Sequence, residues 1–188
     1  MAVLFDGDDK LFKELIKSSK VYGEYGCGLS TIWAAKETNS LVCSVDTSKE
    51  WIDKVNNDLS LDQQKRVIIH HIDVGECHNW GFPKSYKYRH NFIKYIESIW
   101  IRKPTPDLIL IDGRFRVSCF LMSLLSASEG AHIIFDDYVN RHHYHVVEEY
   151  VDVEKIYGRQ ALFIVPPKNK LKLTNITEEI EKFLFVLN

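Results

Sequence analysis

Short apolar runs, most of them followed at once by an acidic residue, recur along the chain. They occupy residues 41–46, 66–72, 106–112 and 131–136, and a shorter run that begins at Val21 ends near Glu24. Runs of this length without polar alternation are typical of strands buried on both faces of a parallel sheet. Each run therefore predicts a strand, and acids are expected at the carboxyl ends of these strands.

Between these runs, apolar residues recur every three or four positions, which predicts helices. The expected helices span residues 8–18, 30–36, 89–102 and 119–127, and another helix is expected to continue through 148–153. Residues 153–157 and 162–165 read as two last strands, joined through Gly158 as an antiparallel pair. Strands that alternate with helices predict an α/β protein with a doubly wound, mostly parallel sheet.

The 188 residues are enough for one domain with a sizeable core. We expect a single domain over 1–188, with its core in about 18–166 and a helical tail in 171–188. The tail carries an apolar stripe made of Ile180, Phe183, Leu184 and Leu187. Such a stripe either docks on the body of the chain or contacts a second copy, so a homodimer through this helix is an open alternative.

The first strand runs into a glycine turn that includes Gly26 and Gly28. Glycine allows a positive φ and lets a ligand approach the backbone without a Cβ in the way, and the following helix N-terminus presents amides. A dinucleotide fingerprint has a third glycine, where this chain has Thr31. Glu24 would repel a pyrophosphate and suits a ligand with hydroxyls and an ammonium. The alternative is a plain turn without a ligand.

Asp46 lies 18 residues after Gly28, at the end of the second expected strand. An acid at this spacing in a βαβ unit accepts hydrogen bonds from ribose hydroxyls. The alternative is that Asp46 caps the helix that follows it. The glycine turn upstream favours the ribose interpretation.

The pattern Glu24-x-Gly26-x-Gly28-x-Ser30 resembles motif I of the class I S-adenosylmethionine (SAM) dependent methyltransferases. The resemblance covers roughly residues 18–166 and implies a Rossmann-like sheet of seven strands, mostly parallel with a final antiparallel strand, and SAM as cofactor. It implies cofactor contacts along the strand ends. The expected cofactor-binding residues are Glu24, Tyr25, Gly26, Gly28, Ser30, Asp46, Thr47, Asp73, Val74, Trp80 and Asp112. For Asp73 a turn before Gly75, and for Trp80 a structural aromatic turn, are the alternatives.

Asp112 ends the strand expected at 106–112 and is followed by Arg114 and Arg116. At a sheet edge where ligands bind, Asp112 is expected beside the methyl group of the cofactor. Arginines offer paired donors for a carboxylate or phosphate of a substrate. Their alternative is an ion pair with Glu24, Asp46 or Asp136. The expected catalytic residues are Asp112, Arg114, Asp137 and His142, with His143 as another candidate base.

Asp112, Asp136 and Asp137 also resemble the acids that hold Mg²⁺ in metal-assisted O-methyltransferases of the catechol and macrocin type. The departure is Asp137, where catechol-type enzymes usually have Asn. Three converging carboxylates need a compensating charge, which is either a divalent ion or an arginine. We expect no metal, and Arg114 as the compensating residue in preference to Arg116.

Composition narrows the possible partners. The net charge is −2 without a basic block, so no nucleic acid is expected, and no apolar run reaches the roughly 18–20 residues that span a bilayer. The four cysteines form no C-x-x-C pair and are expected to be free thiols in a cytoplasmic protein. The function expected is methyl transfer from SAM to a small molecule, at oxygen. The alternatives are a SAM-binding module without catalysis and a nicotinamide-dependent oxidoreductase.

Overall fold

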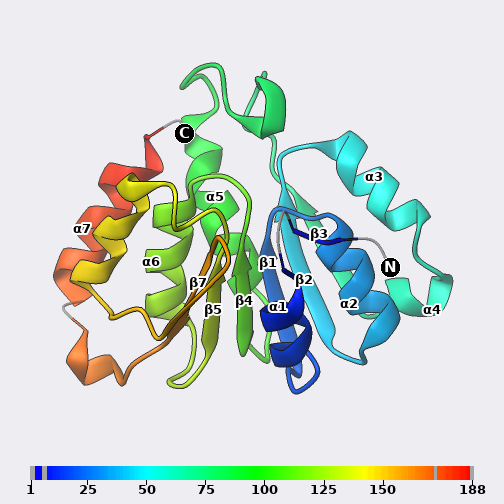
Figure 1. Cartoon of the computed structure of the whole chain (residues 1–188). Helices are drawn as coiled ribbons and strands as arrows, with labels where there is room; N and C mark the ends of the chain where they lie inside the picture. Colours follow the sequence, from blue (N-terminus) through cyan, green and yellow to red (C-terminus); the bar gives the residue numbers. More distant parts are fainter. Residues whose placement is uncertain (1–2, 6–7, 172, 187–188) are drawn as a thin grey trace.

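A computed structural model describes residues 3–5, 8–171 and 173–186. Its seven-stranded sheet has the order β3-β2-β1-β4-β5-β7-β6 (Figure 1). The strands are β1 (Val21–Tyr25), β2 (Leu41–Asp46), β3 (Val67–His71), β4 (Leu108–Ile111), β5 (His132–Phe135), β6 (Lys155–Tyr157) and β7 (Gln160–Ile164). Pairs within β1 to β5 are parallel, whereas β7 is antiparallel to both β5 and β6. The expected Rossmann-like sheet with a final antiparallel strand is therefore confirmed.

Helices cover both faces of the sheet (Figure 1). One face carries α1 (Lys10–Leu15), α2 (Leu29–Glu37) and α3 (Lys49–Asn57), and the short α4 (Leu61–Gln64) follows α3. The other face carries α5 (Phe92–Glu97), α6 (Arg116–Ser126) and α7 (Leu173–Leu184). No helix in the described part of the chain is long and apolar enough to cross a membrane.

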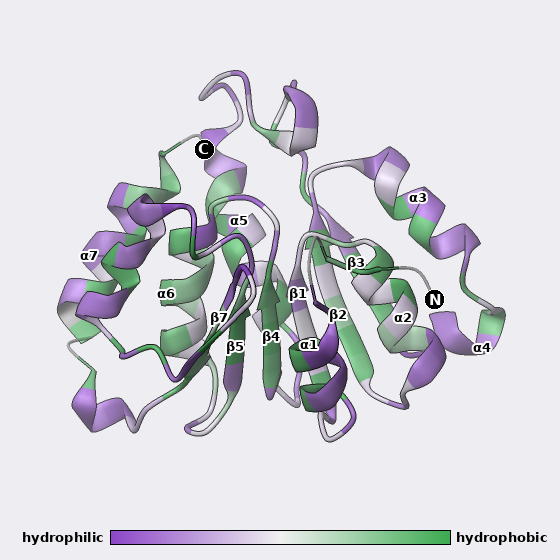
Figure 2. Cartoon of the chain, viewed as in Figure 1, coloured by the Kyte–Doolittle hydropathy of each residue, from purple (hydrophilic) through white to green (hydrophobic). Residues whose placement is uncertain are grey.

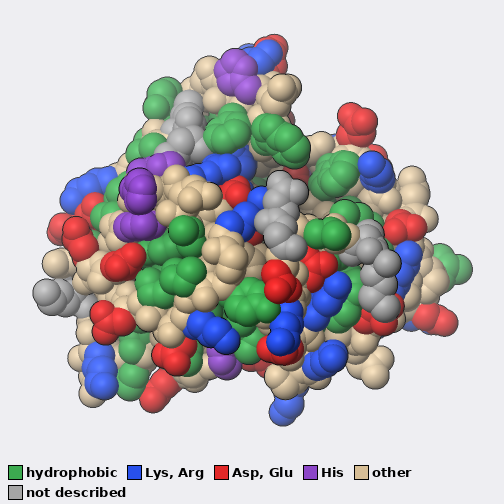
Figure 3. All heavy atoms as spheres, in the orientation of Figure 1, with side chains coloured by type: hydrophobic (Ala, Val, Ile, Leu, Met, Phe, Trp, Pro, Cys, Tyr) green, Lys and Arg blue, Asp and Glu red, His purple; other side chains and the backbone are tan. Residues whose placement is uncertain are grey.

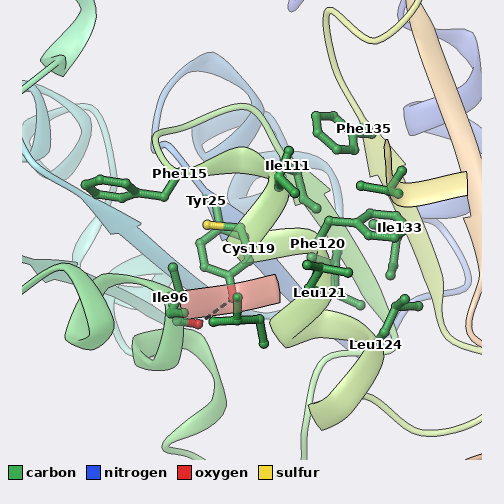
Figure 4. Packing of buried hydrophobic residues seen from close by; sticks show 14 of the residues in the cluster. Tyr25, Ile96, Ile111, Phe115, Cys119, Phe120, Leu121, Leu124, Ile133 and Phe135 are labelled. Atoms are coloured by element: carbon green, nitrogen blue, oxygen red, sulfur yellow. Dashed lines mark hydrogen bonds between the residues drawn. The ribbon is translucent and has the colours of Figure 1, made fainter. Parts of the chain in front are cut away.

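Each central strand contributes side chains to both faces, which explains the apolar runs without alternation. On β4, Leu108 and Leu110 pack under α1 to α3, while Ile109 and Ile111 pack under α5 and α6. Figure 2 shows β4 in green. Figure 4 shows the α6 side of this core, where the Tyr25 hydroxyl donates to the Ile96 carbonyl at 2.6 Å.

Three expected helices have different bounds in the structure. The helix expected at 8–18 is the shorter α1 (Lys10–Leu15). The helix expected at 89–102 is divided into the 3₁₀ helix η2 (Arg89–Asn91), α5 and the 3₁₀ helix η3 (Ser98–Trp100). The helix expected to continue through 148–153 stops early, because the 3₁₀ helix η4 (His142–Glu149) ends at Glu149. Apolar spacing reports which face is buried, and 3₁₀ and α turns bury nearly the same positions over a few residues.

The C-terminal stripe docks on its own chain. Ile180 and Leu184 are buried in the cluster that contains α6, and Ser118 Oγ donates to the Ile180 carbonyl at 3.1 Å. Leu187 lies outside the described residues. The buried part of the stripe is thus used within the chain, and a homodimer through this helix stays an untested prediction.

The connection from β3 to η2 rises above the carboxyl ends of the strands (Figure 1). It contains the 3₁₀ turn η1 (Asn79–Gly81) and is closed by an antiparallel bridge between Cys77 and Pro83. The amide of His78 donates to the Phe82 carbonyl at 2.7 Å. We call residues 75–88 the capping loop. After β7, η5 (Lys168–Lys170) leads to α7.

Candidate functional site

The turn after β1 needs a glycine at its first position. Gly26 has φ of 94°, and a Cβ placed on it would lie 2.8 Å from the Cα of Gly113 in the turn after β4. A Cβ on Gly28 would meet only Trp51 Nε1, at 3.5 Å. Gly26 therefore joins the two turns backbone to backbone, while Gly28 leaves the start of α2 open to an approaching ligand.

Glu24 lies beneath this turn rather than at its surface. The carboxylate is fully buried and accepts hydrogen bonds from the hydroxyls of Tyr22, Ser30, Thr31 and Ser44. Burial raises the pKa of Glu24 to about 7, although the four hydroxyl donors oppose the shift. The side chains of Glu24 and Ser30 thus hold the turn in place. Both carboxylate oxygens of Glu24 already accept hydrogen bonds from protein hydroxyls, so neither is free for the ligand contact that was expected of it.

Two more expected cofactor residues point their side chains into the core. Tyr25 is fully buried and donates to Ile96, and Val74 is 2% exposed within the same cluster. Contacts from these residues to a ligand can come only from backbone atoms. A cofactor role of Tyr25 and Val74 through their backbone atoms stays a prediction.

Asp46 stands at the carboxyl end of β2 beside the glycine turn. One carboxylate oxygen accepts from the Cys27 amide at 3.0 Å and the other from the Ser48 amide at 2.8 Å. The side chain that caps α3 is Ser48, which accepts from Trp51 N at 3.2 Å. Burial raises the pKa of Asp46. The N-cap of α3 is thus Ser48 and not Asp46. Asp46 is held between the glycine turn and α3, and its carboxylate oxygens can accept further hydrogen bonds.

The capping loop closes over this edge of the sheet. Gly81 has φ of 76°, and a Cβ on it would lie 2.6 Å from Thr47 Oγ1. Trp80 is 87% exposed, and the aromatic residue that packs against Arg114 is Phe82. Asp73 accepts from the Gly75 amide at 2.8 Å, which is the turn role given above as its alternative.

Asp112, Asp136 and Asp137 meet at the ends of β4 and β5, and we call them the acid cluster. Each offers an oxygen within 4.8 Å of the others. Asp136 is fully buried, whereas the side chains of Asp112 and Asp137 are 32% and 20% exposed. Asp137 has φ of 57°, a left-handed conformation that Asn and Asp adopt more readily than other residues.

Three arginines neutralise the acid cluster. Arg116 pairs with Asp112 at 2.9 Å and with Asp137 at 3.3 Å. Arg141 pairs with Asp137 at 2.8 Å. Arg159 pairs with Asp136, and with Asp137 at 3.2 Å. The charge is therefore balanced by arginine, as expected, but the choice of Arg114 was wrong.

Arg114 points elsewhere because the chain turns sharply after it. Phe115 has φ of 54° and precedes α6, so Arg116 begins the helix facing the cluster. Arg114 is 7% exposed, and its guanidinium carbon lies 3.9 Å from the centre of the Phe82 ring. Within the described chain, Arg114 makes no ion pair with an acid.

A divalent ion does not fit the acid cluster in this arrangement. Carboxylate oxygens are suitable ligands for Mg²⁺, and their spacing permits a common ion. Each of the three carboxylates is, however, paired with at least one guanidinium, and Arg116 is almost fully buried at the centre. An ion would have to displace these guanidinium groups or lie among them.

The pKa of Asp112 suits proton transfer at neutral pH. Burial raises it to about 7, the neighbouring Asp136 and Asp137 add to the rise, and Arg116 opposes it. His142 is exposed, and its ring packs edge-on against His145. The histidines gather on the surface near η4, where Figure 3 shows a purple group left of centre. Partial exposure at the strand edge makes Asp112 the better placed base.

The sequence interpretation missed Arg141, Arg159 and Gln160. Gln160 Nε2 donates to Asp136 at 2.8 Å, beside the Arg159 pair. The fold places Arg159 and Gln160 here, because β7 runs antiparallel to β5 and so begins where β5 ends. Polar residues just after the Gly158 turn therefore had to lie next to Asp136.

Known structures with the same architecture are methyltransferases. A methyltransferase-like protein from Silicibacter pomeroyi is 28% identical, with a TM-score of 0.81 over 93% of this chain and 92% of that chain. A putative O-methyltransferase from Klebsiella pneumoniae is 19% identical, with a TM-score of 0.55 over 84% and 77%. An O-methyltransferase from Bacillus cereus in complex with S-adenosylhomocysteine (SAH) is 16% identical, with a TM-score of 0.55 over 84% and 78%.

The sequence matches no protein-family model and no curated protein. The likeness is therefore carried by structure. It extends over nearly the whole of both chains only for the Silicibacter pomeroyi protein among these three.

Proposed function

We propose that this chain, a member of the class I SAM-dependent methyltransferase fold family, transfers the methyl group of SAM to an oxygen atom of a small-molecule acceptor. The observation that carries the proposal is the joined pair of turns at Gly26 and Gly113. This pair brings the open glycine turn, Asp46 and Asp112 to one edge of the sheet. The similarity to the putative O-methyltransferase from Klebsiella pneumoniae and to the O-methyltransferase from Bacillus cereus supports oxygen as the acceptor atom.

In the proposed complex, the backbone around Gly28 receives the methionine part of SAM, and Asp46 accepts hydrogen bonds from the ribose hydroxyls. Both oxygens of Asp46 are already oriented by amides, at 3.0 and 2.8 Å. Orientation before binding reduces the entropy lost when the ligand is fixed. Thr47 and Gly81 lie where the capping loop would cover the ribose and adenine.

The transfer itself requires alignment and the removal of one proton. The acceptor oxygen attacks the methyl carbon, the carbon–sulfur bond breaks towards sulfur, and SAH leaves as a neutral thioether. The acceptor hydroxyl loses its proton to Asp112, which is partly exposed and has a pKa of about 7. The bases expected from the sequence are Asp137, His142 and His143, and Asp137 is held by three arginines.

A nicotinamide cofactor suits this turn less well. Thr31 occupies the place of the third glycine, and its hydroxyl accepts from the Gly28 amide at 2.9 Å and donates to Glu24. The Gly28 amide is therefore engaged by the protein, and Glu24 lies beneath the turn that would receive a pyrophosphate.

The four free cysteines support a cytoplasmic location.

Calorimetry with SAM, SAH and NAD tests the cofactor. We expect SAM and SAH to bind and NAD to bind much more weakly or not at all. Tighter binding of NAD than of SAM would contradict the proposal. Binding of SAM without SAH production from any offered hydroxyl compound would favour a SAM-binding module without catalysis.

Asp46→Ala tests the ribose contact. Because hydrogen bonds to a charged acceptor contribute roughly 1.5–3 kcal/mol, we expect SAH affinity to fall about tenfold or more. Asp53→Ala removes an exposed acid from α3 and is the matched control. Equal affinities of both folded variants would show that Asp46 only organises the turn.

A further inference from the structure

Arg114 is a buried cation whose guanidinium has no acceptor among the described residues. The side chain is 93% buried, since its residue exposure is 7%. Its backbone is fixed, because the Arg114 amide donates to Tyr95 Oη at 3.2 Å and the Arg114 carbonyl accepts from Cys119 Sγ at 3.2 Å. The guanidinium contacts the Phe82 ring and the stem lies against Gly81.

The contact with Phe82 does not compensate for this burial. The attraction of a cation to an aromatic face is weaker than the cost of removing a charged group from water. Burial and the neighbouring Arg116 lower the pKa of Arg114, yet a guanidinium stays protonated in proteins. Its donors therefore require an acceptor that the described residues do not supply.

The acid cluster is not available to Arg114. Its three carboxylates are already paired with Arg116, Arg141 and Arg159. Three arginines thus balance the three acids of the cluster, and Arg114 is a fourth cation, which lies against Phe82 of the capping loop.

We propose that Arg114 binds an oxyanion of the methyl acceptor, a carboxylate or a phosphate group close to the oxygen that is methylated. The inference rests on the function proposed above. Arg114 follows Gly113, which contacts Gly26 of the glycine turn, so the anion lies next to the methionine end of the cofactor. The planar guanidinium presents paired donors to such a group. The capping loop, through Gly81 and Phe82, forms the wall that encloses it.

The test uses the full chain saturated with SAH and three probes that differ in charge. Benzoate and phenyl phosphate carry the oxyanion, and benzamide is the neutral analogue of benzoate. Binding to the SAH complex is measured by calorimetry and by the shift of the melting temperature. Failure of SAH to bind contradicts the proposed function, whereas the probes test Arg114 only once SAH is bound.

We expect benzoate or phenyl phosphate to bind and benzamide not to bind. Arg114→Gln should weaken the anion roughly tenfold or more, the loss of a charge-assisted hydrogen bond, without changing SAH affinity. Arg141→Gln is the matched control, because Arg141 lies at the same edge but is partly exposed and paired with Asp137. Arg114→Lys keeps the charge without the paired donors and should bind the anion with intermediate affinity.

Three outcomes would overturn the proposal. One is that neither anion binds the wild-type complex, and another is that Arg114→Gln and Arg141→Gln bind the anion equally. The third is that Arg114→Gln weakens SAH but not 5′-methylthioadenosine, which lacks the amino-acid part. That result would assign Arg114 to the carboxylate of the cofactor. If Arg114→Gln does not fold, the comparison of wild type with Arg114→Lys decides the question.

Discussion

Replacing Arg116 with methionine should destabilise the fold far more than the same change at Arg141. Both arginines pair with Asp137, at 3.3 and 2.8 Å. The side chain of Arg116 is only 4% exposed, whereas that of Arg141 is 38% exposed. Methionine keeps an unbranched apolar stem, so the comparison mainly removes charge and hydrogen bonds.

The contacts of Arg116 set the expected magnitude. It donates to three carbonyls, those of Gly113 at 3.1 Å, Asp136 at 2.7 Å and Asp112 at 3.2 Å. It is also the cation paired with the Asp112 carboxylate. Removing one partner of a buried pair costs about 3–5 kcal/mol, and an exposed pair contributes about 0–1 kcal/mol. We expect losses in these ranges for Arg116→Met and Arg141→Met.

The loss should also depend on pH. Burial already raises the pKa of Asp112 to about 7, and without Arg116 this pKa rises further. A carboxyl whose folded pKa exceeds its unfolded value stabilises the fold below the unfolded pKa, and this stability is lost as pH rises through the folded pKa. At pH 6 the variant escapes part of the penalty by holding a proton on Asp112, so the larger loss is expected at pH 8.5.

Urea unfolding followed by tryptophan fluorescence measures both quantities, since the chain has four tryptophans. The slope of the transition should stay constant across the variants, so that the midpoint reports stability. If Arg116→Met loses no more stability than Arg141→Met at either pH, the acid cluster does not depend on Arg116 as a buried partner.

Further predictions concern the metal, the buried acid and the tail. A chelator should leave activity and melting temperature unchanged and millimolar Mg²⁺ should raise neither, because arginines already neutralise the acid cluster; magnesium-dependent turnover would contradict this. Between pH 4.5 and 8 the wild type should lose roughly 3 kcal/mol more unfolding free energy than Glu24→Gln, since burial raises the pKa of Glu24 from 4.5 to about 7; parallel stability curves would exclude this. Ile180→Ala should cost about 2–5 kcal/mol in urea unfolding and Leu173→Ala, exposed on the same helix, about 0.5 kcal/mol or less, and equal losses would show that α7 is not docked through Ile180.

Strand positions were the most predictable part of the fold. The run at 41–46 coincides with β2, and the runs around β4 and β5 contain those strands with one or two extra residues at each end. Burial on both faces leaves a direct mark on sequence, because most positions of such a strand are apolar. Helix bounds were less predictable, since the stretch from Arg89 to Trp100 buries one face whether its turns are α or 3₁₀.

The site was predictable as a set of strand ends but not as a set of contacts. Asp46 and Asp112 could be placed because the carboxyl ends of parallel strands share an edge. The choice between Arg114 and Arg116 depended on the backbone of Phe115. Its φ of 54° could not be foreseen from the sequence, because a positive φ is expected at glycine and not at phenylalanine. The role of Arg159 depended on which strand pairs with β5, a non-local fact that spacing along the chain does not contain.

The same geometry explains why the resemblance to metal-assisted enzymes stops at the acids. A left-handed residue at position 137 accepts Asp or Asn equally well, so the backbone does not select between them. The neighbours do, because Arg116, Arg141 and Arg159 all pair with residue 137. An asparagine there would leave three cations around two carboxylates, whereas an aspartate balances them. The acid at 137 therefore goes together with the arginines, which supply the positive charge that balances the acid cluster.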